Sequence, residues 1–344
     1  MKLGIGMFGD MSFDLQTKKY QKASERLKEI IEEVKLADEL GIDSFAMGEH
    51  HREDYAVPAP EILLASVASV TKNIRLLSGV NVISSADPVK LFQDFVMIDL
   101  ISNHRAEIMA GRGSFIESFP LFGYNLEDYN ELFEEKLELL LTLRSNEVVN
   151  WKGQFRVPIV NQTIYPRPER EIPISIAVGG TPASVLRAAK LGLPIVFAII
   201  GGNPEQFKPL IEYYKEVYAQ SGHDIKKMKI GVHSHTFIAD SEEEIMNDYY
   251  PHYAHAMNKI GRERGWRSAY TPANFKASIG PDGALYMGEP DYVAEKLIKT
   301  IEMFEIEQYI AHIDVGGPDH KQMMKNIELL GTKVFPKVKE YFKG

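Results

Sequence analysis

Three consecutive polar residues, Glu49-His50-His51, are the first candidates for chemistry in this chain. A histidine near its unperturbed pKa can take or give a proton at neutral pH. The apolar run Ser44–Met47 before them is typical of a strand, so in a parallel barrel they would lie at the rim that carries active sites. We expect His50 to do acid–base work and His51 and Glu49 to orient it; an exposed polar loop is the alternative.

A glycine-rich turn, Gly179–Ser184, is a candidate for binding an anion. Gly179 and Gly180 let the backbone approach a ligand closely. The free N–H groups at the start of the helical pattern that follows favour negative charge, and Thr181 and Ser184 add hydroxyls. The turn could cradle a phosphate, and an ordinary threonine N-cap is equally compatible with it.

Two further features point to the same rim. Arg112 stands between two glycines after the strand-like run Ala106–Ala110 and would bring a guanidinium there, although a surface ion pair is an equal alternative. Gly79 interrupts the run Ile74–Ile83, and glycine inside a strand often marks a bulge or a close backbone approach.

Histidines in a later strand-like run allow a different chemistry. His233 and His235 share one face, because side chains alternate along a strand. A metal site of the type used by barrel hydrolases could combine them with His50, His51 and Asp314. Over such a metal site we favour the alternative that these polar side chains pack inside the barrel with their hydrogen-bonding groups paired.

The pattern G-x-G-x-x-G occurs at Gly4, Gly6 and Gly9. It would bind a dinucleotide only if it opened a helix directly after a strand. Here the first two glycines lie inside a strand-like run and no helical pattern follows at once, so small residues on a barrel strand are favoured.

Eight short apolar runs alternate with helical patterns, which predicts an α/β fold of the (β/α)8 or TIM-barrel type. The runs are Leu3–Met7, Ser44–Met47, Ile74–Ile83, Ala106–Ala110, Ile174–Val178, Ile195–Ile200, Lys229–Ile238 and Gln308–Val315. Asn146–Arg170 and Asp240–Leu285 exceed a minimal barrel and are expected as insertions after strands 4 and 7. The sequence shows no linker or low-complexity tract, so residues 1–344 are expected to form one domain.

Bulk composition limits the partners of this chain. Its 344 residues carry a formal net charge of -9, so the chain lacks the excess positive charge that binds nucleic acid or an anionic membrane surface. It has no cysteine, so disulfides and thiolate chemistry are excluded. Neither a signal-peptide pattern nor an apolar run of transmembrane length is present. We expect a cytoplasmic protein that acts on a small molecule.

Several of these segments together resemble the bacterial luciferase-like flavin-dependent monooxygenase family, from the first strand to the last helix. Ala46–His51 is similar to the family's E-H-H signature. Ser84–Val89, followed by Asp94, Asp99 and Ser102–Arg105, is similar to its A-x-P-V…D…LDxLSxGR segment, with His104 in place of the usual glycine. Gly111–Gly113 and Gly179–Ser184 fall where the family places flavin contacts.

The resemblance implies roles for individual residues. Gly79 and Val80 match a non-prolyl cis peptide that lies against the isoalloxazine, and His50 matches the catalytic base. Thr181 and Ser184 match phosphate-binding positions, and Arg112 matches a basic residue near the phosphate. Met7, Gly179 and Gly180 complete the expected cofactor-binding set, whereas Asn130 stands where luciferase has a second phosphate-binding arginine.

The resemblance thus implies oxidation of a small organic substrate by O2, with reduced FMN as co-substrate. It also implies a separate flavin reductase as a possible partner and a homodimer. Two other classes stay open, a metal-dependent barrel hydrolase and a flavin-binding protein without turnover. The deazaflavin F420 is a further alternative cofactor, although its longer acidic tail would require more basic residues at the rim than this chain offers.

Overall fold

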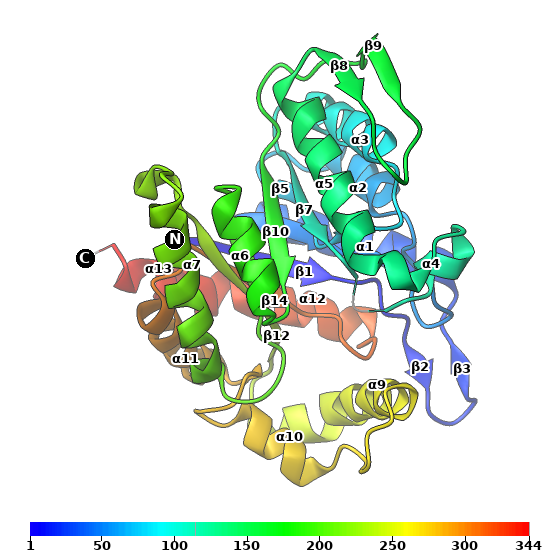
Figure 1. The fold of residues 1–344 in the computed structure, drawn as a ribbon. Helices are drawn as coiled ribbons and strands as arrows, with labels where there is room; N and C mark the ends of the chain where they lie inside the picture. Colours follow the sequence, from blue (N-terminus) through cyan, green and yellow to red (C-terminus); the bar gives the residue numbers. More distant parts are fainter. Residues whose placement is uncertain (114, 344) are drawn as a thin grey trace.

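A closed barrel of eight parallel strands forms the centre of the computed structural model, which describes residues 1–113 and 115–343 (Figure 1). The barrel strands are β1 (Lys2–Met7), β4 (Ser44–Met47), β5 (Arg75–Ser78), β7 (Ala106–Gly111), β10 (Ile174–Val178), β11 (Ile195–Ala198), β12 (Ile230–Ile238) and β14 (Gln308–His312). Each strand pairs in parallel with the next, and the pairing of β10 with β7 closes the ring. The predicted (β/α)8 fold is confirmed.

Helices surround the barrel, as Figure 1 shows, because most lie on the connections between neighbouring strands and the last two follow β14. The main ones are α1 (Ala23–Glu39), α2 (Pro60–Ala68), α3 (Pro88–Ile101), α5 (Tyr129–Ser145), α6 (Pro182–Lys190), α7 (Lys208–Gln220), α11 (Pro290–Phe304), α12 (His320–Leu329) and α13 (Phe335–Tyr341). In α1, Ile30, Val34 and Ala37 recur at helical spacing and are buried against the barrel wall.

The predicted long strand Ile74–Ile83 is divided into two. β5 ends at Ser78, a cis peptide joins Gly79 to Val80, and the short strand β6 (Asn81–Val82) resumes pairing with β7. The non-prolyl cis peptide was expected at this bond, and that prediction is confirmed. The interruption moves the chain from the barrel wall to the rim, where Val80 and Val82 can face a ligand.

Both segments expected as insertions have structure of their own. The first carries the antiparallel hairpin of β8 (Val148–Trp151) and β9 (Ile159–Thr163). The second carries α8 (Glu242–Glu244), the π-helical turn Ile245–Tyr249, α9 (Tyr250–Glu263) and α10 (Pro272–Ile279). Directly after it, β13 (Tyr286–Gly288) extends the sheet beside β12. Figure 1 shows the hairpin beside α5 and α3, and α9 and α10 together below the barrel.

The remaining elements are short. They are β2 (Phe13–Asp14), β3 (Lys19–Tyr20), α4 (Ser118–Leu121), the 3-10 turns Leu126–Asp128, Pro204–Phe207 and Ile225–Lys227, and the π-helical turn Leu330–Val334. Within residues 1–113 and 115–343, no helix combines the length and the apolar character needed to cross a bilayer.

Candidate active site

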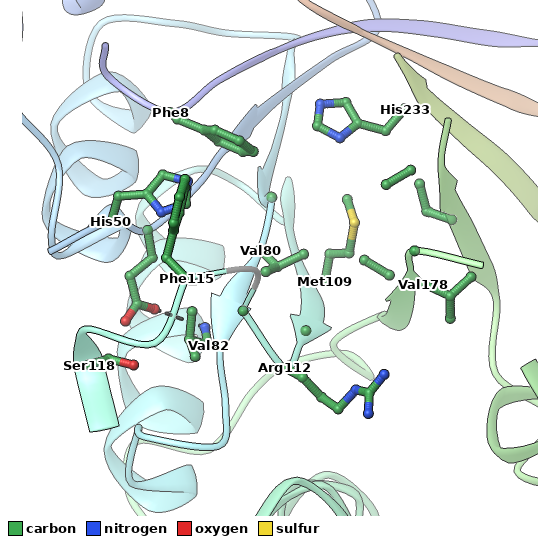
Figure 2. A pocket seen from close by; sticks show the side chains of 18 of the residues that line it. Phe8, His50, Val80, Val82, Met109, Arg112, Phe115, Ser118, Val178 and His233 are labelled. Carbon is green, nitrogen blue, oxygen red and sulfur yellow. Dashed lines mark hydrogen bonds between the residues drawn. The ribbon is translucent and has the colours of Figure 1, made fainter. Parts of the chain in front are cut away.

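A cavity of about 300 Å³ opens at the carboxyl ends of the barrel strands. Its floor is apolar and includes Val80, Met109 and Val196, which pack with other small and aliphatic side chains inside the barrel. Polar groups reach it from its walls, and Figure 2 shows His50, His233 and Arg112 on different sides of the same space. This is the rim at which the sequence placed the candidate residues.

His50 is held among aromatic rings. The ring centroids of Phe8, Tyr55 and Phe115 lie 4.6, 4.5 and 4.9 Å from that of His50. Its Nε2 atom is buried and has no hydrogen-bond partner among the residues that the structure describes. Burial lowers the pKa of His50 to about 3. The ring is therefore neutral, with one nitrogen free for a ligand.

Glu49 organises the neighbourhood of His50 without bonding to it. One carboxylate oxygen lies 2.9 Å from His51 Nε2, and the other accepts the backbone N–H of Val82 at 2.9 Å. Glu49 therefore fixes His51 and the segment just after the cis peptide. This differs from the expected arrangement, since aromatic packing positions the His50 ring in place of Glu49 and His51.

The Gly79–Val80 peptide forms part of the cavity floor. Gly79 donates its N–H to the carbonyl of Met47 at 2.7 Å, and both Gly79 and Val80 line the cavity. A Cβ atom at Gly79 would lie 2.8 Å from the Cβ of Ala46, so only glycine lets the peptide sit this close to the neighbouring strand.

Arg112 lies at the other end of the cavity, beside the start of α6. Its guanidinium donates to Ser184 Oγ at 3.0 Å and to Asn130 Oδ1 at 2.7 Å, and lies over the ring of Tyr129. Thr181 is the N-cap of α6, and within the described chain its side chain makes no capping hydrogen bond. A Cβ atom at Gly179 would meet open space. A cation, a hydroxyl and a helix start thus converge on one polar pocket.

Three predicted cofactor-binding residues do not line the cavity among the described residues. Met7 is fully buried, and its sulfur accepts from Arg26 Nη2 on the helix side of the barrel; the next residue, Phe8, faces the cavity instead. Met7 was misplaced because strand alternation turns it outward from the barrel axis. Gly180 turns at a φ of +102° beside Phe207, and Ser184 acts through its bond to Arg112.

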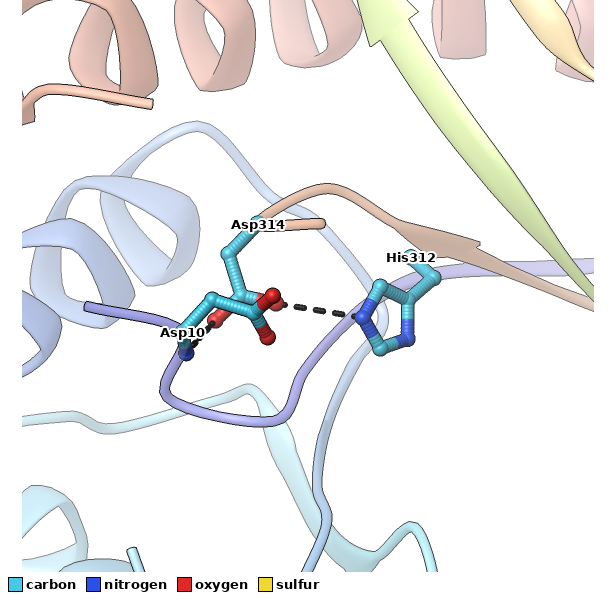
Figure 3. A group of neighbouring side chains, drawn as sticks. All are labelled: Asp10, His312 and Asp314. Carbon is cyan, nitrogen blue, oxygen red and sulfur yellow. Dashed lines mark hydrogen bonds and ion pairs between the residues drawn. The ribbon is translucent and has the colours of Figure 1, made fainter. Parts of the chain in front are cut away.

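A chain of buried polar residues on the far wall was only partly anticipated. His233 and His235 line the cavity, and His233 Nε2 lies 2.9 Å from Nδ1 of His312. The His312 Nε2 atom lies 3.1 Å from Asp314 Oδ1, as Figure 3 shows. The sequence reasoning missed His312. The available signal was its spacing of two from Asp314, which places both on one face at the end of the last strand.

The metal ligands proposed from sequence are not brought together. Among the described residues, the group near the cavity that could hold an ion is Asp10, His312 and Asp314, without His50 or His51. The oxygens of Asp314 already accept the backbone N–H groups of Phe8 and Gly9, at 3.0 and 2.8 Å. These bonds occupy the lone pairs that a metal would need, so the donor set fits a structural role better than a metal centre.

Comparison with known proteins decides the family. The family model for luciferase-like monooxygenases matches residues 1–304. The chain belongs to the luciferase-like monooxygenase family. The oxygenase component of flavin-dependent trigonelline monooxygenase from Acinetobacter baylyi is 26% identical, over 91% of this chain and 90% of that protein.

Solved structures share the whole barrel. The oxygenating constituent of 3,6-diketocamphane monooxygenase from Pseudomonas putida, solved with FMN, matches this luciferase-like chain with a TM-score of 0.78 and 20% identity, and 98% of each chain is covered. The F420-dependent tetrahydromethanopterin reductase from Methanopyrus kandleri matches with a TM-score of 0.72 and 18% identity, over 97% of this chain and 98% of that one. These two proteins share the fold of this chain, and membership of the luciferase-like monooxygenase family makes this chain an oxidoreductase.

The buried histidines predict how the stability of this luciferase-like protein depends on pH. Burial lowers the pKa of both His50 and His235 to about 3, whereas an unfolded histidine titrates near 6.5. Between these values the unfolded chain binds protons that the folded chain does not, so stability falls as pH drops below about 6.5. From pH 7 to pH 5 the loss should approach about 2 kcal/mol for each such histidine.

Urea unfolding at pH 7, 6 and 5 measures this loss. His50→Gln and His235→Gln should each flatten the pH dependence, and His223→Gln, a change at a half-buried ring beside the end of α6, should leave it as in the wild type. An unchanged pH slope in both cavity variants would show that these rings are not held neutral by burial.

Proposed function

We propose that this protein is the oxygenase of a two-component system, which oxidises a small organic substrate with O2 and reduced FMN delivered by a separate reductase. The observation that carries this proposal is one cavity with two chemically different ends. An apolar floor around the Gly79–Val80 peptide lies at one end, and Arg112 lies with the start of α6 at the other.

The apolar end suits a flat, fused ring. Val80, Met109 and Val196 offer an uncharged surface, and the close approach of Gly79 to the β4 strand keeps that surface level with the barrel wall. Such a surface would support the isoalloxazine of FMN by van der Waals contact.

The polar end suits a phosphate. Arg112 has a positive charge already oriented by Ser184 and Asn130, and Thr181 has a side-chain hydroxyl that does not cap its helix. The open space beside Gly179 leaves room for a ligand to approach the backbone. One guanidinium and one helix start match the single phosphate of FMN better than the longer acidic tail of F420.

Reduced FMN, when bound, would supply the two electrons that let O2 give one oxygen atom to the substrate and one to water. The protein would contribute orientation, shielding and proton handling. Phe8 and Phe115 flank His50 and exclude water from its Nε2 atom. This nitrogen can accept a proton or a hydrogen bond from the substrate as it reacts.

The proposed partners follow from relatives and from the surface. The trigonelline and diketocamphane proteins are named as the oxygenase part of their systems, which supports a separate reductase here. Exposed apolar side chains gather on α2, α3 and the hairpin segment, namely Ile62, Met97, Ile101, Val157, Val160 and Tyr165. Such a surface supports a homodimer.

The first test concerns the phosphate end. FMN should bind at least tenfold more tightly than riboflavin, because only FMN brings a phosphate to Arg112 and the α6 start. Arg112→Leu should weaken FMN binding by about tenfold or more, since a hydrogen bond to a charged group contributes about 1.5–3 kcal/mol, and should leave riboflavin binding nearly unchanged. Fluorescence titration measures these affinities.

Arg187→Leu is the matched control, because Arg187 lies on α6, whose start faces the cavity, but its guanidinium pairs with Glu134 on α5. Equal affinities for FMN and riboflavin would refute the phosphate site, and tighter binding of F420 than of FMN would assign the other cofactor.

The second test concerns the source of electrons. The protein–FMN complex should be reduced slowly by NADH or NADPH alone, because Gly4 and Gly6 lie inside β1 and the pattern they belong to does not open a helix. Addition of an unrelated flavin reductase should start O2-dependent turnover. Stopped-flow absorbance follows the reduction, and fast, saturable reduction without the reductase would instead show a one-component oxidoreductase.

The third test concerns His50. His50→Phe keeps a ring of similar size among Phe8, Tyr55 and Phe115 but removes Nε2, so FMN binding should persist while turnover falls about a hundredfold or more. Turnover is measured with reduced FMN against aldehydes, sulfonates and amines. His255→Gln, a ring stacked on Phe13, is the control. If His50→Phe turns over as the wild type does, His50 is not the proton-handling group. If the wild type binds FMN but turns over no substrate, the protein is a flavin-binding protein only.

A further inference from the structure

A second imidazole reaches the cavity on the side away from His50. The ring of Phe8 lies between the two, with its centroid 4.6 Å from that of His50 and 6.0 Å from that of His233. Figure 2 shows the His233 ring above the space over Val80 and Met109. Whereas His50 Nε2 has no partner within the described chain, His233 is the first of a series of closely spaced polar side chains.

That series ends on a buried carboxylate. His233 Nε2 lies 2.9 Å from His312 Nδ1, and His312 Nε2 lies 3.1 Å from Asp314 Oδ1. Asp314 is fully buried, yet its contacts with His312, Arg26 and the N–H of Phe8 hold its pKa below the usual range. It is therefore ionised, and an ionised carboxylate can only accept hydrogen bonds. The carboxylate therefore favours a proton on the His312 nitrogen that faces it, Nε2.

The position of this proton fixes the rest of the series. With a single proton, His312 keeps it on the nitrogen that faces Asp314, and its Nδ1 is then an acceptor. His233 must then donate its Nε2–H to His312, which leaves the lone pair on His233 Nδ1. A Cβ atom on Gly6 would lie 3.2 Å from His233 Nε2, so this edge of the ring packs against the barrel wall and the opposite edge is turned to the cavity.

We propose that His312 carries one proton and that His233 is therefore a hydrogen-bond acceptor of fixed tautomer in the cavity, held in that form by His312 and Asp314. It would bind an N–H or O–H group of a ligand and disfavour a ligand that offers only a carbonyl oxygen at this point. Only the identity of the ligand rests on the proposed function. Under that function, the donor is either a ring N–H of FMN or a hydroxyl or amine of the substrate. A buried polar group that is left unpaired penalises a ligand that lacks its match, so His233 is a specificity-determining residue.

The tautomer is measured on the protein without ligand, by long-range proton–nitrogen NMR with ¹⁵N-labelled histidine at pH 7.5. His233→Gln and His312→Gln assign the signals. The wild type should show His233 with a protonated Nε2 and a bare Nδ1. His312→Phe removes the acceptor, so His233 should shift toward an average of both tautomers, whereas the control variant His223→Gln should leave its signals unchanged. A protonated His233 Nδ1 in the wild type, or no response to His312→Phe, would overturn the proposal.

The source of the donor is found in the same spectra. If FMN alone moves the His233 Nδ1 signal toward its hydrogen-bonded position, the flavin supplies the donor. If the signal moves only when benzyl alcohol is added to the FMN complex, and benzaldehyde leaves it unmoved, the substrate position supplies it. His233→Phe should then weaken binding of the effective probe about three- to tenfold.

If neither FMN nor the alcohol moves the signal, or if alcohol and aldehyde move it equally, His233 is not a selective acceptor. These results are independent of turnover and of the preference for FMN over riboflavin. Failure of the proposed oxygenase function and failure of the His233 proposal are therefore distinguishable.

Discussion

The rest of the site depends on the hydrogen bonds of one buried carboxylate, that of Asp314. It is fully buried at the end of the last strand and accepts the backbone N–H groups of Phe8, Gly9 and Asp10, the residues that leave the first strand. A buried charge is tolerated only where charge and hydrogen bonds compensate it. Here Arg26 lies 3.6 Å away, and burial together with the neighbouring carboxylate raises the pKa of Asp10 well above its usual range, so that the pair carries one negative charge.

This single carboxylate connects the place where the barrel closes, between β14 and β1, to the cavity. By fixing the chain after β1, Asp314 places the ring of Phe8, which touches His50 on one side and His312 on the other, with centroids 4.6 and 4.1 Å away. The position of His50 is therefore set partly from the opposite end of the sequence. Closure of the barrel, which brings β14 beside β1, is a requirement for the site as well as for the fold.

The sequence predicted the barrel because its eight apolar runs are short, regular and separated by helical patterns, and it placed His50, Arg112 and Thr181 at the right rim. It could not predict the pairing of His233 with His312, because 79 residues separate them and only the register of β12 with β14 joins them. Met7 was misassigned for a related reason. Which residue at a strand end faces the barrel interior depends on the strand register, and a single sequence does not state that register. The aromatic shell of His50 also escaped notice, since phenylalanines in loops carry no local mark of function.

The two imidazoles of the cavity are in contrasting environments, and the contrast argues for a division of work between them. His50 is surrounded by apolar ring faces, and with no partner on Nε2 within the described residues it is free to change its hydrogen bonding when a ligand arrives. In the proposed arrangement His233 donates to His312 through one nitrogen, so its other nitrogen presents the same lone pair in every ligand state. Proton transfer needs a group whose bonding can change during the reaction, whereas recognition needs one whose bonding is already fixed. On this ground we propose that His50 does the acid–base chemistry and His233 selects the ligand, although both are neutral histidines at the same rim.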